Sequence, residues 1–272
     1  MENDAPVGRS LPRISPCRFL ISLDFDGTLW LDDCRPPIPT AFFERMEKWR
    51  GQGVWWGINT GRTMAYLCED WQQYAPYLPD FICTCERFVF LSDEEGILRG
   101  LTGHNNVALA AAMVLSERMQ PLLHAELERI ANRFPHLEWI IAPTDPLSVE
   151  AKDSATMDVL AMLLQPLMSA HPNVSMQRAG RYMRLADARF HKGSALAHVA
   201  EEWGVEHGNI LIIGDGHNEI DAFERFPSAF CAAPSDAHPE VLTWLRQQGG
   251  YISSSPGVMQ ILDHWSLRMH LN

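Results

Sequence analysis

Hydrophobic and polar residues follow two alternating patterns in the first and last thirds of the chain. Apolar residues recur at helical spacing over 40–50, where Phe42, Phe43, Met46 and Trp49 fall on one face. Short apolar runs typical of buried strands lie at 18–24, 54–58, 81–84, 209–214 and 229–232. Strands and helices that alternate in this way predict a parallel sheet covered by helices.

The middle third has a different pattern. A long helical stretch covers 105–134, and Pro121 predicts either two helices or one kinked helix. A second helix is expected over 155–170, and strands are expected over 138–142, 147–152, 174–178 and 181–186. The order of one helix, two strands, one helix and two strands favours an antiparallel sheet with helices on one face. The parallel unit is therefore interrupted by an insert of domain size.

Composition excludes some classes of partner. The formal net charge is −12, with 46% hydrophobic and 21% charged residues, and there is no basic run. Nucleic acid and anionic membranes are therefore not expected as partners. Residues 1–16 lack the apolar core of a signal peptide, and we expect a cytoplasmic protein. The six cysteines do not form paired metal-ligand spacings, so buried reduced thiols are expected, Cys83 and Cys85 among them.

Four polar clusters follow the predicted strands or open the predicted helices. Asp24 and Asp26 end the first strand, Thr60 ends the second, and Asp215 follows the strand at 209–214. Lys192 stands just before a helix. The carboxyl ends of parallel strands meet at one edge of a sheet, where ligands bind. Each cluster alone is more often a turn or a helix cap, but four of them in order indicate a binding site.

These residue types suit phosphoryl transfer. Asp24 is the expected nucleophile, and Asp26 can protonate the leaving oxygen and later activate water. Mg²⁺ held by Asp24, the backbone carbonyl of Asp26 and Asp215 would cancel the repulsion between carboxylate and phosphate. Thr60 is expected to donate to phosphoryl oxygens from its hydroxyl and its backbone N–H, and Lys192 adds a positive charge.

The four clusters resemble the sequence motifs of the haloacid dehalogenase superfamily of phosphatases. The matching segments are D-F-D-G-T-L at 24–29, N-T-G-R at 59–62, H-K-G-S-A-L at 191–196 and G-D-G-H-N-E-I-D-A at 214–222. The insert resembles the cap of the Cof-type and sucrose-phosphatase-like branch. The resemblance implies an α/β fold: a Rossmann-like parallel-sheet core (17–101 and 187–272), an inserted α+β cap domain (102–186) and a flexible tail (1–16).

The resemblance also implies roles for single residues. Asp24 and Asp26 would be catalytic, and Asp24, Asp26, Asp215 and Glu219 would hold Mg²⁺. Thr60, Gly61, Arg62, Lys192 and Asn218 would bind the substrate. Two positions depart from the motifs: Glu219 stands where aspartate is usual, and Cys85-Glu86 stands where the branch often has Asn-Gly.

Basic residues of the insert are candidates for contact with the leaving group. They are Lys152, Arg178, Arg181 and Arg184. Arg181 and Arg184 are separated by an odd number of positions, so a regular strand points at most one of them at the site. Arg181 is the one we expect to bind substrate, and Trp30 is expected to line the entrance.

The leading hypothesis is a Mg²⁺-dependent phosphatase for a small phosphorylated metabolite, most simply a sugar phosphate. Two alternatives remain open. A phosphomutase would use the same aspartyl-phosphate chemistry, and a catalytically weak phospho-ligand binder would account for Glu219 and Cys85-Glu86.

Overall fold

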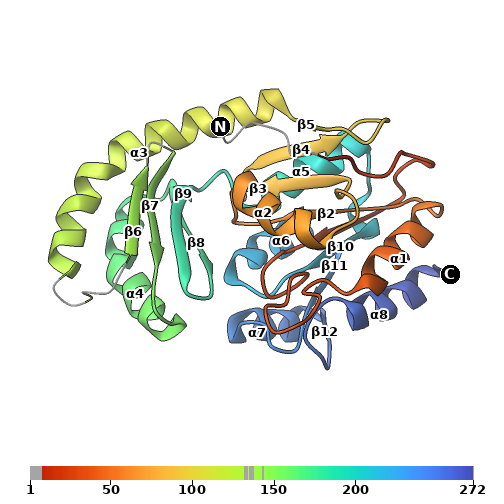
Figure 1. Cartoon of the computed structure of the whole chain (residues 1–272). Coiled ribbons are helices and arrows are strands. Elements are labelled where there is room, and N and C mark those ends of the chain that lie inside the picture. The colour runs from red at the N-terminus through yellow and green to blue at the C-terminus, as the bar shows by residue number, and fades with distance from the viewer. Residues whose placement is uncertain (1–7, 132–133, 135–137, 143, 272) are drawn as a thin grey trace.

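An eight-stranded sheet forms the larger part of the molecule (Figure 1). The computed structural model describes residues 8–131, 134, 138–142 and 144–271. The strands lie in the order β12-β11-β10-β1-β2-β3-β4-β5. The strands from β12 to β3 run parallel, β4 is antiparallel to β3, and β5 is antiparallel to β4. Their bounds are β1 Phe19–Leu23, β2 Val54–Asn59, β3 Phe81–Thr84, β4 Phe88–Ser92, β5 Leu98–Gly100, β10 Ile210–Ile213, β11 Phe230–Ala233 and β12 Tyr251–Ile252.

Helices cover both faces of this sheet because its strands are apolar on both sides. Successive residues of β1 divide between two cores: Phe19 and Ile21 face one, and Leu20 faces the other. The first core includes α1 (Thr40–Arg50), α2 (Met64–Tyr74) and α8 (Met259–Met269). The second includes α5 (Lys192–Trp203), α6 (Ile220–Arg225) and α7 (Pro239–Gln248). Two short 3₁₀ turns, η1 (His207–Asn209) and η2 (His217–Glu219), flank β10.

A four-stranded antiparallel sheet forms the smaller part, in the order β6-β7-β9-β8. Its strands are β6 Glu138–Ala142, β7 Asp145–Glu150, β8 Val174–Ala179 and β9 Tyr182–Asp187. α3 (Thr102–Ala131) and α4 (Ser154–Ala170) pack on one face, through a core that includes Leu123, Leu160 and Leu185. Of the two alternatives at Pro121, the structure has one helix that runs through it.

The predicted α/β architecture, a parallel sheet interrupted by an antiparallel insert, is confirmed. The proposed domain boundaries fall where α3 begins and where β9 ends. Residues 1–7 of the predicted tail lie outside the described residues. Residues 8–16 are not loose, because Ser10 is buried and bonds to Gly96, and the buried Arg50 donates to the carbonyl of Pro12 at 2.9 Å.

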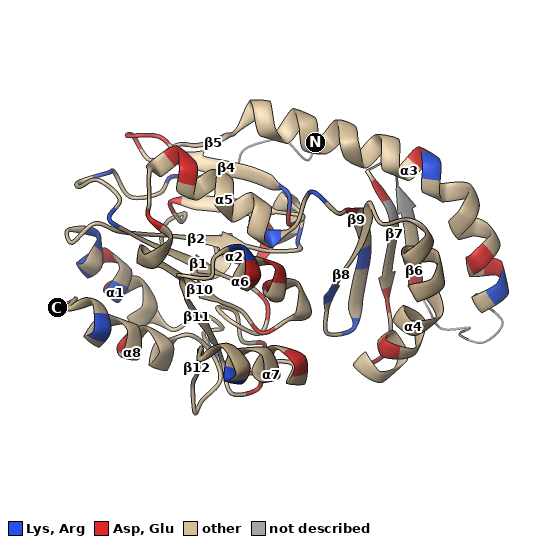
Figure 2. Ribbon diagram, turned by 180° about the vertical axis from the view of Figure 1, so that it is seen from behind, with Lys and Arg blue, Asp and Glu red and all other residues tan. Residues whose placement is uncertain are grey.

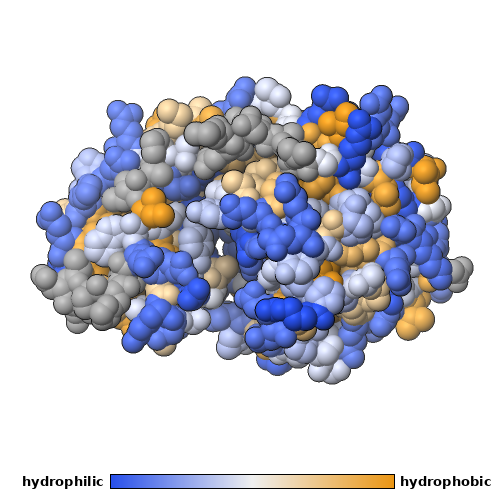
Figure 3. All heavy atoms as spheres, viewed as in Figure 1, coloured by the Kyte–Doolittle hydropathy of each residue, from blue (hydrophilic) through white to orange (hydrophobic). Residues whose placement is uncertain are grey.

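The two parts meet along β8 and β9. Figure 2 shows basic positions on these two strands, on the side of the small sheet nearest to the large one. In the space-filling view a narrow opening separates the two parts (Figure 3). Within the described residues, no helix is long and apolar enough to cross a membrane.

Candidate active site

The four predicted polar clusters meet at the carboxyl edge of the large sheet. β1 lies between β10 and β2, all parallel, so Asp24, Thr60 and Asp215 follow adjacent strands. Asn59, at the end of β2, donates from Nδ2 to the backbone carbonyl of Lys192 at 2.9 Å and so ties the start of α5 to this edge. The parallel topology therefore brings together residues that are far apart in the sequence.

Lys192 is completely buried between two carboxylates. Its Nζ lies 2.7 Å from Oδ1 of Asp24 and also contacts the carboxylate of Glu219. Burial alone would lower the pKa of Lys192, but the two carboxylates outweigh it and raise that pKa above its ordinary range. The ammonium group is therefore permanently charged, and it holds Asp24 in place.

Asp215 lies against the turn that follows Asp24. Its Oδ1 accepts a hydrogen bond from the hydroxyl of Thr28 at 3.0 Å. Gly27 has φ +72°, and a Cβ there would lie 2.5 Å from Oδ2 of Asp215, so the turn needs a glycine for both reasons. Burial, reinforced by the negative charge of Asp24, raises the pKa of Asp215 to about 7. Two carboxylates thus approach each other at a site that calls for a cation.

The donor set at this site fits Mg²⁺. Asp24 and Asp215 offer hard carboxylate oxygens, and a divalent cation would offset the burial and the repulsion from Asp24 that raise the pKa of Asp215. Asp26 has its carboxylate bound to Arg62, which leaves its backbone carbonyl for the predicted role. The groups that could hold Mg²⁺ are therefore the side chains of Asp24 and Asp215 and the backbone carbonyl of Asp26.

Glu219, the fourth predicted metal ligand, lies on the Lys192 side of the cluster. Its side chain is 2% exposed, and burial raises its pKa well above the ordinary value. Gly214 makes room for it, since a Cβ at 214 would lie 2.2 Å from the Glu219 side chain. The extra methylene relative to aspartate is thus accommodated by packing on glycine, and the carboxylate pairs with Lys192.

Asp26 and Arg62 form a two-pronged ion pair. Nε of Arg62 donates to Oδ2 of Asp26 at 2.8 Å, and a terminal nitrogen donates to Oδ1 at 2.6 Å. The other terminal nitrogen contacts Asp70 at 2.5 Å. Burial raises the pKa of Asp26 above its ordinary value, and the bonds from Arg62 offset only part of this shift.

Thr60 differs from its prediction in one respect. Its backbone N–H donates to the carbonyl of Cys83 at 2.9 Å, as part of the pairing between β2 and β3, and so it is not available to phosphate. The hydroxyl oxygen accepts from the N–H of Arg62 at 3.1 Å, which leaves the hydroxyl hydrogen to donate. The sheet extends one residue further than the turn expected from Thr60-Gly61.

Glu86 is brought to the site by the unusual Cys85-Glu86 turn. Cys85 and Glu86 adopt left-handed φ values of +50° and +59°, which are strained for residues other than glycine. The Glu86 side chain is buried, and its Oε1 accepts from Nδ2 of Asn218 at 2.8 Å. Oε2 of Glu86 and Oδ1 of Asn218 are buried without a hydrogen-bond partner. This departure from the motif predicts an acidic or thiol group near the leaving-group pocket, and the structure shows that the buried acidic group there is Glu86.

Arg184, and not Arg181, reaches from the small sheet to the site. Arg181 precedes β9, is 63% exposed and pairs with Glu150 at 2.9 Å. Arg184 is 2% exposed and donates to the carbonyl of Cys85 at 2.6 Å and to that of Gly61 at 3.4 Å. As the odd spacing predicts, only one of the two arginines reaches the site, but the prediction of Arg181 is wrong, because Arg181 lies in the turn before β9 and Arg184 lies in the strand.

The remaining predicted contacts lie further out. Lys152 is exposed, and Arg178 pairs with Asp158 at 2.5 Å. Trp30 packs against Phe25 and donates from Nε1 to an exposed aspartate at 2.8 Å.

Comparison with known proteins agrees with this geometry. Residues 145–262 match the family model of haloacid dehalogenase-like hydrolases. A phosphoglycolate phosphatase from Methanothermobacter thermautotrophicus is 30% identical over 83 residues, which cover 30% of this chain and 35% of that protein. The match thus spans about a third of the length of this curated relative.

Solved structures share the fold over nearly the whole chain. A sucrose-phosphatase from Synechocystis sp. PCC6803, in complex with sucrose and phosphate, has a TM-score of 0.68 at 24% identity and covers 93% of this chain and 98% of its own. A haloacid dehalogenase-like hydrolase protein from Bacillus subtilis has a TM-score of 0.61 at 10% identity and covers 96% of this chain and 95% of its own. Residues 145–262 are therefore similar to the haloacid dehalogenase-like hydrolases, and the chain as a whole shares the fold of these solved structures.

Proposed function

We propose that the protein is a Mg²⁺-dependent phosphatase that hydrolyses a small sugar phosphate through an aspartyl-phosphate on Asp24. The observation that carries this proposal is the fixed position of Asp24. Lys192 Nζ at 2.7 Å and the N–H of Phe25 at 2.8 Å both contact its Oδ1. These contacts fix the rotation of the carboxylate, and we assign the other oxygen, Oδ2, to attack on phosphorus.

The surrounding residues bind the phosphoryl group. Mg²⁺, held by Asp24 and Asp215, would neutralise negative charge on the phosphoryl oxygens. The Thr60 hydroxyl has a free hydrogen to donate, and the N–H of Gly61 has no acceptor among the described residues. Lys192 supplies a fixed positive charge beside Asp24. Together these groups stabilise the charge that develops during transfer.

Proton transfer requires that Arg62 exchange partners. In the structure both carboxylate oxygens of Asp26 accept bonds from Arg62, so neither oxygen is available to carry a proton to the leaving group. A substrate whose leaving group binds Arg62 would release Asp26, which can then protonate the leaving oxygen and later take a proton from water. Arg62 lies over the ring of Phe25, at 4.9 Å, which supports the guanidinium during this exchange.

A leaving group rich in hydroxyls fits the region around Glu86. Oε2 of Glu86 and Oδ1 of Asn218 are buried acceptors without partners, and unpaired buried acceptors are costly. Sugar hydroxyls would donate to both, and they would also separate the Glu86 charge from the phosphate. This match supports a sugar phosphate over an aryl or alkyl phosphate.

Purified protein assayed with a panel of sugar phosphates and an aryl phosphate tests the proposal. We expect hydrolysis with Mg²⁺, loss of activity with EDTA, and at least about a thousandfold lower kcat in Asp24→Asn. Glu86→Gln should raise KM for sugar phosphates and leave KM for the aryl phosphate unchanged. An Asp24→Asn variant that keeps its activity would refute the mechanism. Equal effects of Glu86→Gln on both substrates would refute the sugar assignment.

A further inference from the structure

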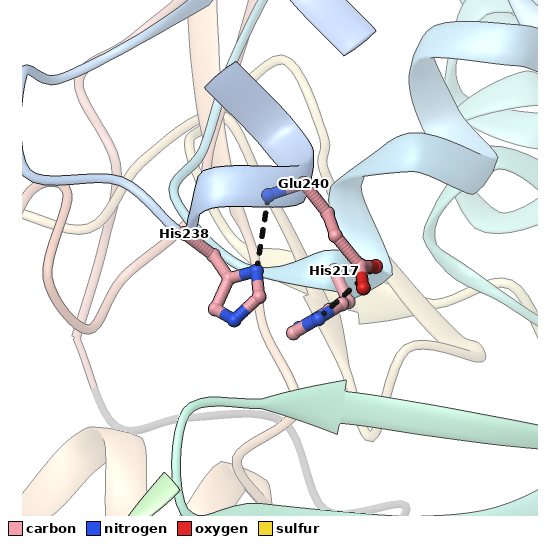
Figure 4. A group of neighbouring side chains, drawn as sticks. All are labelled: His217, His238 and Glu240. Carbon is pink, nitrogen blue, oxygen red and sulfur yellow. Dashed lines mark hydrogen bonds and ion pairs between the residues drawn. The ribbon is translucent and has the colours of Figure 1, made fainter. Parts of the chain in front are cut away.

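Two histidines and a glutamate gather outside the site described above. His217 begins η2, His238 immediately precedes α7, and Glu240 lies in the first turn of that helix. We call these three residues the His217 cluster (Figure 4). The backbone N–H of His238 donates to the carbonyl of Asp215 at 2.9 Å, so the cluster adjoins the candidate Mg²⁺ site through the main chain.

The side chains converge without satisfying one another. One potential ligand atom from each residue lies within 4.8 Å of the others. Nε2 of His217 is 3.3 Å from Oε2 of Glu240, yet neither ring nitrogen of His217, both of them buried, makes a hydrogen bond. The two imidazole rings lie close together, with their centroids 3.7 Å apart and their planes tilted by 41° (Figure 4). A buried imidazole without a hydrogen-bond partner is rare and calls for a ligand.

The charges of the cluster favour a cation. Both ring nitrogens of His217 are buried without a hydrogen-bond partner, so this imidazole can offer a lone pair to a ligand. Glu240 contributes a carboxylate that is 67% exposed and can turn toward a metal. Arg178 faces the cluster from β8, and its charge is balanced by Asp158 at 2.5 Å.

We propose that His217, His238 and Glu240 bind a divalent transition-metal ion of the zinc class, with water completing the coordination. Two imidazoles and one carboxylate are a donor set that suits zinc better than magnesium. Ligand atoms about 2.0–2.1 Å from a tetrahedral ion are about 3.3 Å from each other, which is the separation of the His217 and Glu240 atoms. His238 offers Nδ1, which now accepts only a long bond, 3.3 Å, from the N–H of Glu240.

Metal at this position would join η2 to α7. Both segments contact Asp215, η2 through the loop that follows it in the chain and α7 through the bond to its carbonyl. We therefore expect the ion to stabilise the fold and to fix the backbone that carries the proposed Mg²⁺ ligand. This site does not depend on the proposed phosphatase activity, and its test can be read without substrate.

The experiment uses tag-free, metal-stripped full-length protein in an Asp215→Asn background, which removes the alternative site. Zn²⁺ is titrated by calorimetry, and Co²⁺ is titrated as a spectroscopic probe of tetrahedral coordination. We expect one ion per chain, visible absorption from bound Co²⁺ and a rise in melting temperature. His238→Ala and Glu240→Gln should each weaken Zn²⁺ binding at least about tenfold.

His198→Ala is the matched control. The ring of His198 lies 4.1 Å from that of His104, between centroids, and Nδ1 of His198 lies 3.6 Å from Glu201, so His198 belongs to a second group of two histidines and one glutamate. This control should leave Zn²⁺ binding unchanged. Absence of Zn²⁺ binding at micromolar concentrations, or binding that is lost equally in His198→Ala, would overturn the proposal. Binding that is unaffected by both His238→Ala and Glu240→Gln would also overturn it.

Discussion

Replacing Lys192 by methionine tests the electrostatics at the centre of the candidate site. Methionine has a similar length and no charge, so Asp24 and Glu219 would stay buried without their cation. Removing one partner from a buried ion pair typically costs about 3–5 kcal/mol. Because a folded domain is stable by about 5–15 kcal/mol, this change should remove a large part of the free energy of unfolding.

The loss should depend on pH. Lys192 stays charged over the tested range, since its pKa is raised. Burial raises the pKa of Glu219, and a carboxyl whose folded pKa is raised destabilises the fold as pH rises through that value. The substitution should therefore cost more stability at pH 8 than at pH 5, because higher pH favours ionisation of Glu219, which would then be buried without its cation.

Urea unfolding of wild type and variant in EDTA measures this effect at both pH values. Lys152→Met is the control, because Lys152 is 68% exposed and lies 3.8 Å from Asp153; it should change stability by less than about 0.5 kcal/mol. If Lys192→Met costs no more than this control, or costs the same at both pH values, then the buried carboxylates do not depend on Lys192 and our reasoning is wrong.

Three further predictions follow from the described contacts. Arg184→Met removes a buried cation that joins the two sheets, so it should lower the free energy of unfolding in urea by about 3 kcal/mol or more and raise KM. Arg181→Met, at an exposed position, should change both quantities little. Gly214→Ala should cost about 1–3 kcal/mol, because its Cβ would lie 2.2 Å from a buried glutamate, and Gly208→Ala, with open space around it, should be neutral. The pKa of Asp215 is raised to about 7, so in EDTA the stability of the fold should fall from pH 5 to pH 8 as this carboxyl ionises. Added Mg²⁺ should restore the lost stability. A melting temperature that is independent of pH and of Mg²⁺ would contradict this.

The pattern of apolar runs was sufficient to predict the architecture. Strands buried on both faces are apolar without alternation, and their order in the chain distinguishes the parallel sheet from the inserted antiparallel one. Positions at the ends of these strands were predictable for the same reason. Asp24, Thr60 and Asp215 follow neighbouring parallel strands, and the topology alone places them at one edge.

Single-residue details were not predictable from pattern. β9 begins at Tyr182, so Arg181 lies in the turn and Arg184 lies in the strand that faces the site. The sequence could not distinguish the two arginines, because strand ends are poorly marked in sequence. The N–H of Thr60 is not available to phosphate because it donates to the carbonyl of Cys83 on the neighbouring strand. No residue near Thr60 in the sequence indicates this pairing. Glu86 reaches the site through two consecutive left-handed residues, a conformation that neither Cys85 nor Glu86 favours.

Arg184 has a consequence for the release of products. Its guanidinium ends on the carbonyls of Gly61 and Cys85, in the two loops that border the proposed phosphate position. Any separation of the two sheets must detach this side chain and hydrate both carbonyls. A product would then leave at the same time as the two loops loosen. Arg184, which is 123 residues away from Gly61 in the sequence, would set the rate of this step.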